Sequence, residues 1–136
     1  MTHRAECLCG ALKVGSSGDP EFVIACNCTA CQRRTGSAFG VGAYFHEADV
    51  SVEGVSNSWR RTVDSGRSIT NHFCPSCGSS VYWLLDMRPG LIAVAGGCLT
   101  TPLPEPSRAV WVSNKHDWVA FPERCTLFEE GSPTTR

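Results

Sequence analysis

Short apolar runs, separated by turn-forming residues, recur along the whole chain. Residues 68–73, 81–85 and 91–95 form three such runs, and turn-forming residues at 86–90 separate the last two. Runs of about four to eight residues bounded in this way are typical of β-strands, because an amphipathic helix needs a longer stretch with its own periodicity. The same pattern predicts further strands at 11–14, 21–25, 39–45, 50–52, 58–63 and 109–112.

One segment departs from the strand pattern. Residues 29–34 can form one or two helical turns that end before Gly36, and glycine is the commonest residue just after a helix. Everything else reads as strands and loops, so the protein is expected to be mostly β. Turns are predicted at 15–20, 64–66 and 86–90, and the polar tail from Gly131 is expected to fray.

The length of the chain predicts a single domain. It has 136 residues, without an internal repeat or linker, and its core is expected to extend from about residue 5 to residue 120. The formal net charge of −1 lacks the basic excess that nucleic acid or an anionic membrane would require. Small-molecule or protein partners are therefore favoured, and the sequence leaves open whether the protein forms a homo-oligomer.

The nine cysteines could indicate a secreted disulfide scaffold or a reduced metal-binding protein. Their odd number, the short spacings between them and the lack of an apolar leader favour reduced thiols. No window approaches the apolar length of a membrane span either. We therefore expect a cytoplasmic protein without a membrane partner.

Seven of the nine cysteines fall into three tight groups, which is a pattern typical of zinc sites. Cys74 and Cys77 are separated by two residues and followed by Gly78, so one tight turn can present both sulfur atoms to an ion. Cys7 and Cys9 would leave the same face of an extended strand. These four thiols predict a closed, structural zinc site.

Cys26, Cys28 and Cys31 then form a second site with three thiolates, which is the arrangement of a catalytic zinc with an open position. Alternatively, Cys98 supplies a fourth ligand and makes this site structural as well. Spacing alone does not distinguish this partition from swapped pairings among the groups. In either case up to two Zn²⁺ ions per chain are expected. The first two cysteine groups are also expected to open and close one hairpin.

The order of these motifs resembles a known family. Cys-x-Cys-Gly from Cys7, Cys-Asn-Cys-x-x-Cys from Cys26, Phe-Cys-x-x-Cys-Gly from Phe73 and the Trp-Val-Ser motif from Trp111 to Trp118 are similar to the glutathione-dependent formaldehyde-activating enzyme family, which includes centromere protein V. The resemblance implies a β-tent: a single mostly β domain of short antiparallel sheets with zinc-binding loops. It also implies a structural zinc on Cys7, Cys9, Cys74 and Cys77 and an active-site zinc on Cys26, Cys28 and Cys31.

One position departs from the family pattern. Many members carry a histidine two residues before the aromatic residue of the Trp-Val-Ser motif, and this chain has Ala109 there. If that histidine takes part in the reaction of its relatives, its absence bears on the activity of this protein.

Three thiolates make zinc a poor Lewis acid but a suitable carrier of a sulfur nucleophile. A glutathione thiol held there could add to formaldehyde and give S-hydroxymethylglutathione, the reaction of a carbon–sulfur lyase. The carboxylates of glutathione need positive partners, for which Arg33, Arg34, Arg61 and Lys115 are candidates. The alternative is a zinc-stabilised, non-catalytic binding module with two structural zinc sites.

Two other features carry less weight. A zinc nucleobase deaminase is excluded because His46 is followed directly by Glu47, which breaks the His-x-Glu motif of that class. Cys125 lies in a poorly patterned segment and is expected to be a partly buried, inert thiol.

Overall fold

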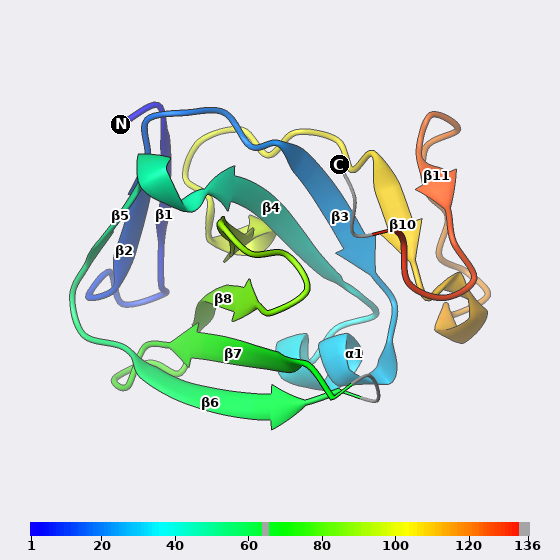
Figure 1. Ribbon diagram of the computed structural model, residues 1–136, viewed down its shortest axis with the longest axis horizontal. Helices are drawn as coiled ribbons and strands as arrows, with labels where there is room; N and C mark the ends of the chain where they lie inside the picture. The colour runs from blue at the N-terminus through cyan, green and yellow to red at the C-terminus, as the bar shows by residue number, and fades with distance from the viewer. Residues whose placement is uncertain (64–65, 134–136) are drawn as a thin grey trace.

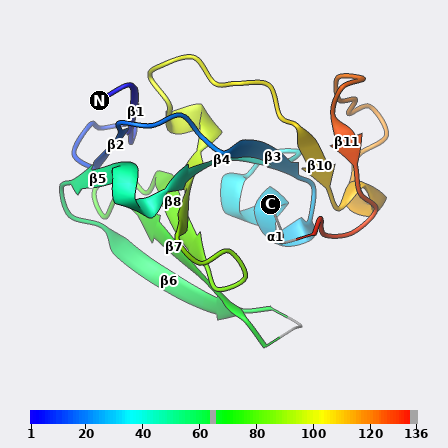
Figure 2. The same ribbon diagram turned by 45° about the horizontal axis from the view of Figure 1, so that its top comes forward.

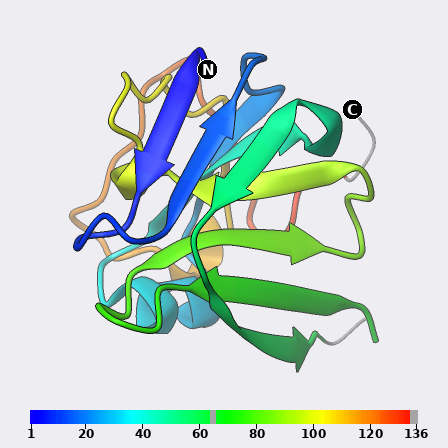
Figure 3. The ribbon, with the colours of Figure 1, turned by 90° about the vertical axis from the view of Figure 1, so that its left-hand side faces the viewer.

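Two sheets lie against each other in the computed structural model, which describes residues 1–63 and 66–133 (Figure 1). The predicted turn at 64–66 and the predicted tail from Gly131 therefore fall partly outside the described residues. The small sheet has the order β1-β2-β5, with bounds His3–Glu6, Lys13–Ser16 and Val50–Glu53. Figure 3 shows these three strands side by side.

The large sheet has eight strands within the described residues, in the order β11-β10-β3-β4-β9-β8-β7-β6. In that order the strands span Thr126–Leu127, Arg108–Val110, Phe22–Cys26, Gly40–His46, Leu91–Ala95, Ser80–Leu85, Ser68–Phe73 and Asn57–Thr62. The predicted mostly β fold is confirmed.

The one α-helix in the described part of the chain is α1, which spans Thr29–Thr35. It ends before Gly36, as predicted, and is one residue longer than expected; Gly36 has the left-handed conformation. It follows the end of β3 and lies inside the curve of the large sheet (Figures 1 and 2). Short 3₁₀ turns occupy Glu47–Asp49, Gly96–Cys98 and Val112–Asn114.

The two faces of the large sheet bury separate apolar cores, because neighbouring residues on a strand point to opposite faces. On β4, Phe45 packs towards the small sheet in a cluster that includes Leu12. Its neighbour Tyr44 packs on the other face with Phe22 and Trp83. The thiols follow this division: Cys7, Cys74 and Cys77 pack with the first cluster, and Cys26 packs with the second.

One prediction about strand pairing is wrong. β2 and β3 do not form a hairpin, because β2 pairs with β1 and β5 while β3 pairs with β4 and β10. Most described strands pair antiparallel, as expected, and β10 adds parallel pairs with β3 and β11. The apolar pattern of each strand was informative, but the pairing depended on contacts between distant segments.

Local boundaries also differ from the prediction. β1 was not predicted, β2 begins two residues later than expected, and β10 ends at Val110 rather than at residue 112. Trp111 explains that early end, because its φ of 55° is outside the range of a strand. The segment of Cys7 and Cys9 is a turn rather than the extended strand that was expected.

Candidate metal centre

Four thiols from two distant turns meet at the junction of the two sheets. The Sγ atoms of Cys7, Cys9, Cys74 and Cys77, called here the four-thiol cluster, all lie within 4.8 Å of one another. Cys9 Sγ is 3.6 Å from Cys7 Sγ and 3.7 Å from Cys74 Sγ. A tetrahedral zinc with Zn–S bonds of about 2.3 Å places its sulfur atoms about 3.8 Å apart, so the spacing fits this ion.

Backbone turns rather than a strand bring these sulfur atoms together. The N–H of Gly10 donates to the carbonyl of Cys7 at 3.0 Å, and the N–H of Gly78 donates to the carbonyl of Cys74 at 2.8 Å. Gly78 has a φ of 76°, a conformation that most other residues avoid. Each Cys-containing loop therefore closes on itself and presents two thiols in one direction.

Hydrogen bonds favour the thiolate form of Cys77 and Cys7. At Cys9 a hydrogen bond with the backbone of Ala11 lowers the pKa, but the contacts with Cys7 and Cys74 outweigh it and raise the pKa to about 11. Cys77 Sγ lies 3.2 Å from Ser79 Oγ, and this contact is the main reason why the pKa of Cys77 falls to about 5. The backbone N–H of Leu12 donates to Cys7 Sγ at 3.3 Å and lowers the pKa of Cys7. Cys thiolates are the form that binds metal, so these contacts favour metal binding at Cys7 and Cys77.

Three further thiols form a second group on the other face of the large sheet. The Sγ atoms of Cys26, Cys28 and Cys31, called here the three-thiol cluster, also lie within 4.8 Å of one another. Cys26 ends β3, Cys28 caps the N-terminus of α1, and Cys31 lies in its first turn. All three are half-buried, so a ligand from solution can approach them.

The three thiols share charge unequally. Hydrogen bonds from Cys26 and Cys31 hold the pKa of Cys28 well below its usual range, and its Sγ accepts the Cys31 N–H at 3.3 Å. The guanidinium of Arg61 acts in the same direction. The pKa of Cys26 is raised instead, first by Cys28 and Cys31 and then by burial. Without a metal, the cluster therefore holds its negative charge mainly at Cys28.

The predicted positive residues differ in what they contact. Arg34 on α1 donates to Ser80 Oγ at 3.2 Å, and its guanidinium lies over the ring of Trp83 at 4.2 Å. Its neighbour Arg33 is exposed. Lys115 donates to the carbonyl of Val119 at 2.9 Å and holds its own loop. Arg34 and Arg61 are thus the cations whose charges act on the three-thiol cluster.

Cys98 is not brought together with the three-thiol cluster. Its Sγ faces the carbonyl of Ser80 at 3.6 Å, and the thiols that act on it electrostatically are Cys7 and Cys77. Burial is the main cause of its raised pKa. Cys98 therefore lies on the side of the four-thiol cluster and is not placed to be a fourth ligand of the three-thiol cluster.

The side chain at position 109 points away from the three-thiol cluster. Ala109 is fully buried in a small apolar cluster with Ala25 and Cys125, whereas Cys26 lies on the opposite face of β3. A histidine at 109 would face this apolar cluster. Cys125 is buried there, and burial raises its pKa, as expected for an inert thiol.

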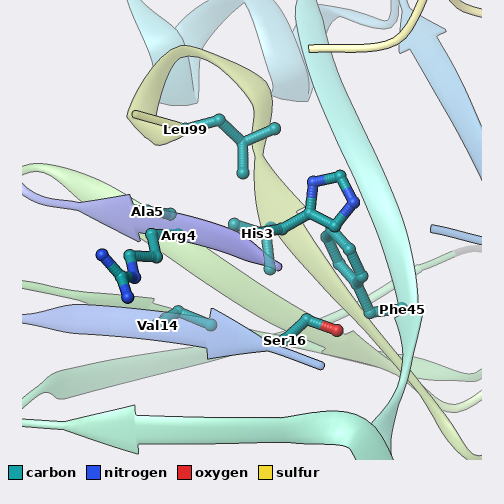
Figure 4. Close-up of a pocket in the computed structure, with 8 residues that line it drawn as sticks. His3, Arg4, Ala5, Val14, Ser16, Phe45 and Leu99 are labelled. Carbon is teal, nitrogen blue, oxygen red and sulfur yellow. The ribbon is translucent and has the colours of Figure 1, made fainter. Parts of the chain in front are cut away.

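Two hollows in the described part of the structure lie away from the thiol clusters. One is a cavity of about 10 Å³ between the two sheets, lined by residues that include His3, Val14, Phe45 and Leu99 (Figure 4). It is large enough for about one water molecule. A wider, open hollow of about 290 Å³ lies between Glu21 and Pro104. Neither is lined by cysteine, so the candidate chemistry remains at the two thiol clusters.

Sequence reasoning missed the residues that support the thiols. Ser79 and Ser80 follow Cys77 and Gly78 directly, and their hydroxyls contact Cys77 and Arg34. Gln32 on α1 donates to the carbonyls of Asn27 and Asn114. The position of the two serines beside a cysteine pair was a usable signal, whereas the partners of Gln32 are distant in sequence.

Comparisons with known proteins identify the family. The family model described as glutathione-dependent formaldehyde-activating enzyme matches residues 2–114. A search of curated proteins finds no match. A crystal structure of a Rhodobacter sphaeroides protein, a Northeast Structural Genomics target, has a TM-score of 0.54 and 22% identity, and the match covers 74% of this chain and 91% of that one. That likeness supports the fold.

No helix in the described residues is both long and apolar enough to cross a membrane. The family match spans most of the chain and contains both thiol clusters. The thiol geometry and the family match therefore agree, and the chain belongs to the glutathione-dependent formaldehyde-activating enzyme family.

Proposed function

We propose that this protein is a zinc-dependent enzyme of the carbon–sulfur lyase type that adds a thiol, glutathione or a similar compound, to formaldehyde or another small aldehyde. The observation that carries the proposal is the three-thiol cluster, which joins Cys26, Cys28 and Cys31 within 4.8 Å at a half-buried position. Three protein thiols on a tetrahedral ion leave one coordination position for a ligand from solution.

Each cluster would hold one zinc ion with a different purpose. In the four-thiol cluster all four positions of a tetrahedral ion are taken by Cys7, Cys9, Cys74 and Cys77, so that ion would be structural. In the three-thiol cluster, a bound zinc ion would lower the pKa of the substrate's thiol.

The positive residues beside the three-thiol cluster would bind and orient the substrate. Arg61 extends from the edge strand β6, is half-buried, and acts on Cys28 through its charge. No described residue forms a hydrogen bond or an ion pair with its guanidinium at contact distance, so it is available for a carboxylate of the thiol substrate. Arg34 is held by Ser80 and Trp83 and would add positive charge to the site without moving.

The reaction balances without an oxidant or a reductant. The sulfur atom of the thiol forms a bond to the carbonyl carbon of formaldehyde, and the π bond of the carbonyl breaks. The carbonyl oxygen takes up the proton that the thiol loses, which gives S-hydroxymethylglutathione when the thiol is glutathione. The protein would contribute by fixing the sulfur atom and neutralising its charge, which are effects of positioning and electrostatics.

Cobalt substitution tests the proposal. Glutathione added to the cobalt-loaded protein should increase the thiolate-to-cobalt charge-transfer absorption, and the protein should speed the consumption of formaldehyde. S-methylglutathione, whose sulfur cannot become a thiolate, should produce neither effect. Cys98→Ala should keep the response, because Cys98 lies away from the cluster. If glutathione changes neither the spectrum nor formaldehyde consumption, the formaldehyde-activating assignment fails, which leaves a zinc-stabilised binding module or an enzyme for a different substrate.

A further inference from the structure

The helix that carries the three-thiol cluster has little structural support of its own. α1 has seven residues, and none of them is fully buried. A helix of this length is unstable in isolation, because the cost of nucleation exceeds the gain from so few hydrogen bonds. The positions of Cys28 and Cys31 therefore depend on the side chains that tie α1 to the rest of the protein.

Two side chains make those ties. Gln32 connects α1 to the carbonyls of Asn27 and Asn114 at 2.8 and 3.1 Å. Arg34 connects α1 to β8, where it donates to Ser80 Oγ at 3.2 Å and stacks over Trp83 at 4.2 Å. Gln32 thus joins α1 to segments near the three-thiol cluster, while Arg34 reaches a different part of the molecule.

The close fit around Arg34 fixes its position. A Cβ atom added at Gly40 would lie 2.9 Å from Arg34 Nη2 and 3.6 Å from the Cβ atom of Cys31. The guanidinium therefore occupies the space that the missing side chain of Gly40 leaves on β4. Because Cys31 borders the same space, a displacement of Arg34 would also disturb the cysteine.

Ser80, the partner of Arg34, directly follows a residue of the four-thiol cluster's own network. Ser79 Oγ lies 3.2 Å from Cys77 Sγ and accepts the N–H of Leu8 at 3.0 Å. The carbonyl of Ser79 accepts the N–H of Cys74 at 2.9 Å. An ion that holds Cys77 and Cys74 would therefore also fix Ser79 and Ser80.

We infer that Arg34 is a positioning residue through which metal at the four-thiol cluster orders the three-thiol cluster, so that the two metal sites fill cooperatively and in that order. The connection runs from Cys77 through Ser79 and Ser80 to Arg34, and from α1 to Cys31. The inference rests on the metal binding in the proposed function but not on the reaction with thiol and aldehyde.

Metal titration of variants tests the role of Arg34. Metal-free protein is titrated with Co²⁺, and the affinity of the three-thiol cluster is measured from its charge-transfer absorption. Arg34→Met should weaken this site by about tenfold or more, as expected for the loss of a residue that supports metal ligands. Arg33→Met is the matched control, because it removes the same charge one residue away from an exposed side chain.

Ser80→Ala tests the hydrogen bond between Arg34 and Ser80 separately from the positive charge of Arg34, because it removes the Oγ acceptor and keeps the arginine. It should weaken the three-thiol cluster without changing the affinity of the four-thiol cluster. Cys77→Ser should lower the Co²⁺ affinity of the three-thiol cluster further, because it removes the metal ligand from which the proposed connection starts. If Cys77→Ser does not fold, the Arg34 and Ser80 variants, which leave all seven thiols in place, still decide the question.

Three outcomes overturn the inference. Equal effects of Arg34→Met and Arg33→Met would show that only overall charge matters. An unchanged three-thiol affinity in Ser80→Ala would remove the proposed connection, and a wild-type titration in which the three-thiol cluster fills first would contradict the order. These results differ from a failure of the proposed function, in which cobalt binds both clusters as inferred but glutathione gives no response.

Discussion

The two thiol clusters differ in how the chain assembles them. The four-thiol cluster joins a turn at Cys7 and Cys9 to a turn at Cys74 and Cys77, and therefore connects segments that are distant in sequence. The three-thiol cluster uses Cys26, Cys28 and Cys31 within one short segment of β3 and α1. An ion in the first cluster would cross-link the fold, whereas an ion in the second would constrain only local backbone.

The surroundings of the clusters differ in the same sense. Cys7 and Cys74 are buried in the core between the two sheets, and the thiols there accept hydrogen bonds from nearby N–H and O–H groups. The three-thiol cluster is half-buried and lies near the charges of Arg34 and Arg61. Under the proposed function, cysteine thiols would therefore stabilise the fold at the four-thiol cluster and leave a position for a substrate at the three-thiol cluster.

The largest expected effect distinguishes the clusters by stability. Cys77→Ser should lower the melting temperature strongly, because the binding free energy of a structural zinc, about 10–16 kcal/mol in small zinc domains, is also folding free energy. Loss of even about 3 kcal/mol corresponds to about 10 °C for a domain of this size. Cys28→Ser should lower it by only a few degrees. Calorimetry of both variants checks this, and equal losses would mean that both sites are structural.

The next effect concerns the aromatic core beneath the three-thiol cluster. Burial raises the pKa of Tyr44 from 10 to about 12, although the positive charge of Arg88 acts in the opposite direction. The folded state holds this proton more tightly than the unfolded state, so the resulting stability is complete below about pH 10 and is lost as pH rises towards 12. The loss should reach about 2–3 kcal/mol.

Spectroscopy can isolate this group because the chain has two tyrosines. In Tyr82→Phe, the absorbance of ionised phenol should report Tyr44 alone and titrate near pH 12. Adding Tyr44→Phe to that background should remove both the absorbance change and the loss of unfolding free energy between pH 10 and 12. A phenol that titrates at its ordinary pKa would show that Tyr44 is not enclosed as the structure indicates.

A smaller effect tests the arginine at the edge of the three-thiol cluster. Arg61→Met should raise the dissociation constant for glutathione by about tenfold, because a hydrogen bond to a charged group contributes about 1.5–3 kcal/mol. Arg60→Met is the matched control, since Arg60 is exposed and pairs with Asp86 at 3.8 Å. An exposed ion pair of this kind contributes little. Calorimetric binding to the zinc-loaded proteins measures both, and equal constants would exclude Arg61 from the site.

The smallest expected effect on the fold comes from mild chelation. A weak chelator should reduce the bound zinc from about two ions to about one, taking the ion from the half-buried three-thiol cluster first. The far-UV circular dichroism should stay unchanged, because the four-thiol cluster keeps its ion. Cys28→Ser, which should begin with about one ion, serves as the control and should lose none. Simultaneous loss of both ions together with structure would remove the distinction between the clusters.

Neighbouring residues show what spacing could not predict. Arg33 and Arg34 were equal candidates in the sequence, but only Arg34 reaches Ser80 and Trp83, because one position on a short helix changes the direction of a side chain by about 100°. Cys98 was a candidate ligand of the three-thiol cluster, but the course of β9 places it beside Ser80. In both cases the deciding contacts join segments far apart in the chain.

The sequence by itself determined the features that depend on local spacing. These are the mostly β pattern, the helix that ends before Gly36, the strands Ser68–Phe73 and Leu91–Ala95, and the grouping of seven cysteines. Each follows from residues within a few positions of one another, where backbone geometry limits the choices.

Only the tertiary structure decided which of these elements meet. It placed β2 and β3 in different sheets, ran β10 parallel to β3, and turned Ala109 away from the thiols. The register and direction of strand pairing depend on which side chains are buried on each of the two faces of a sheet. Those side chains pack against segments from the whole chain, so local sequence does not decide the pairing. The connection from Cys77 through Ser80 to Arg34 exists for the same reason, because packing alone brings its parts together.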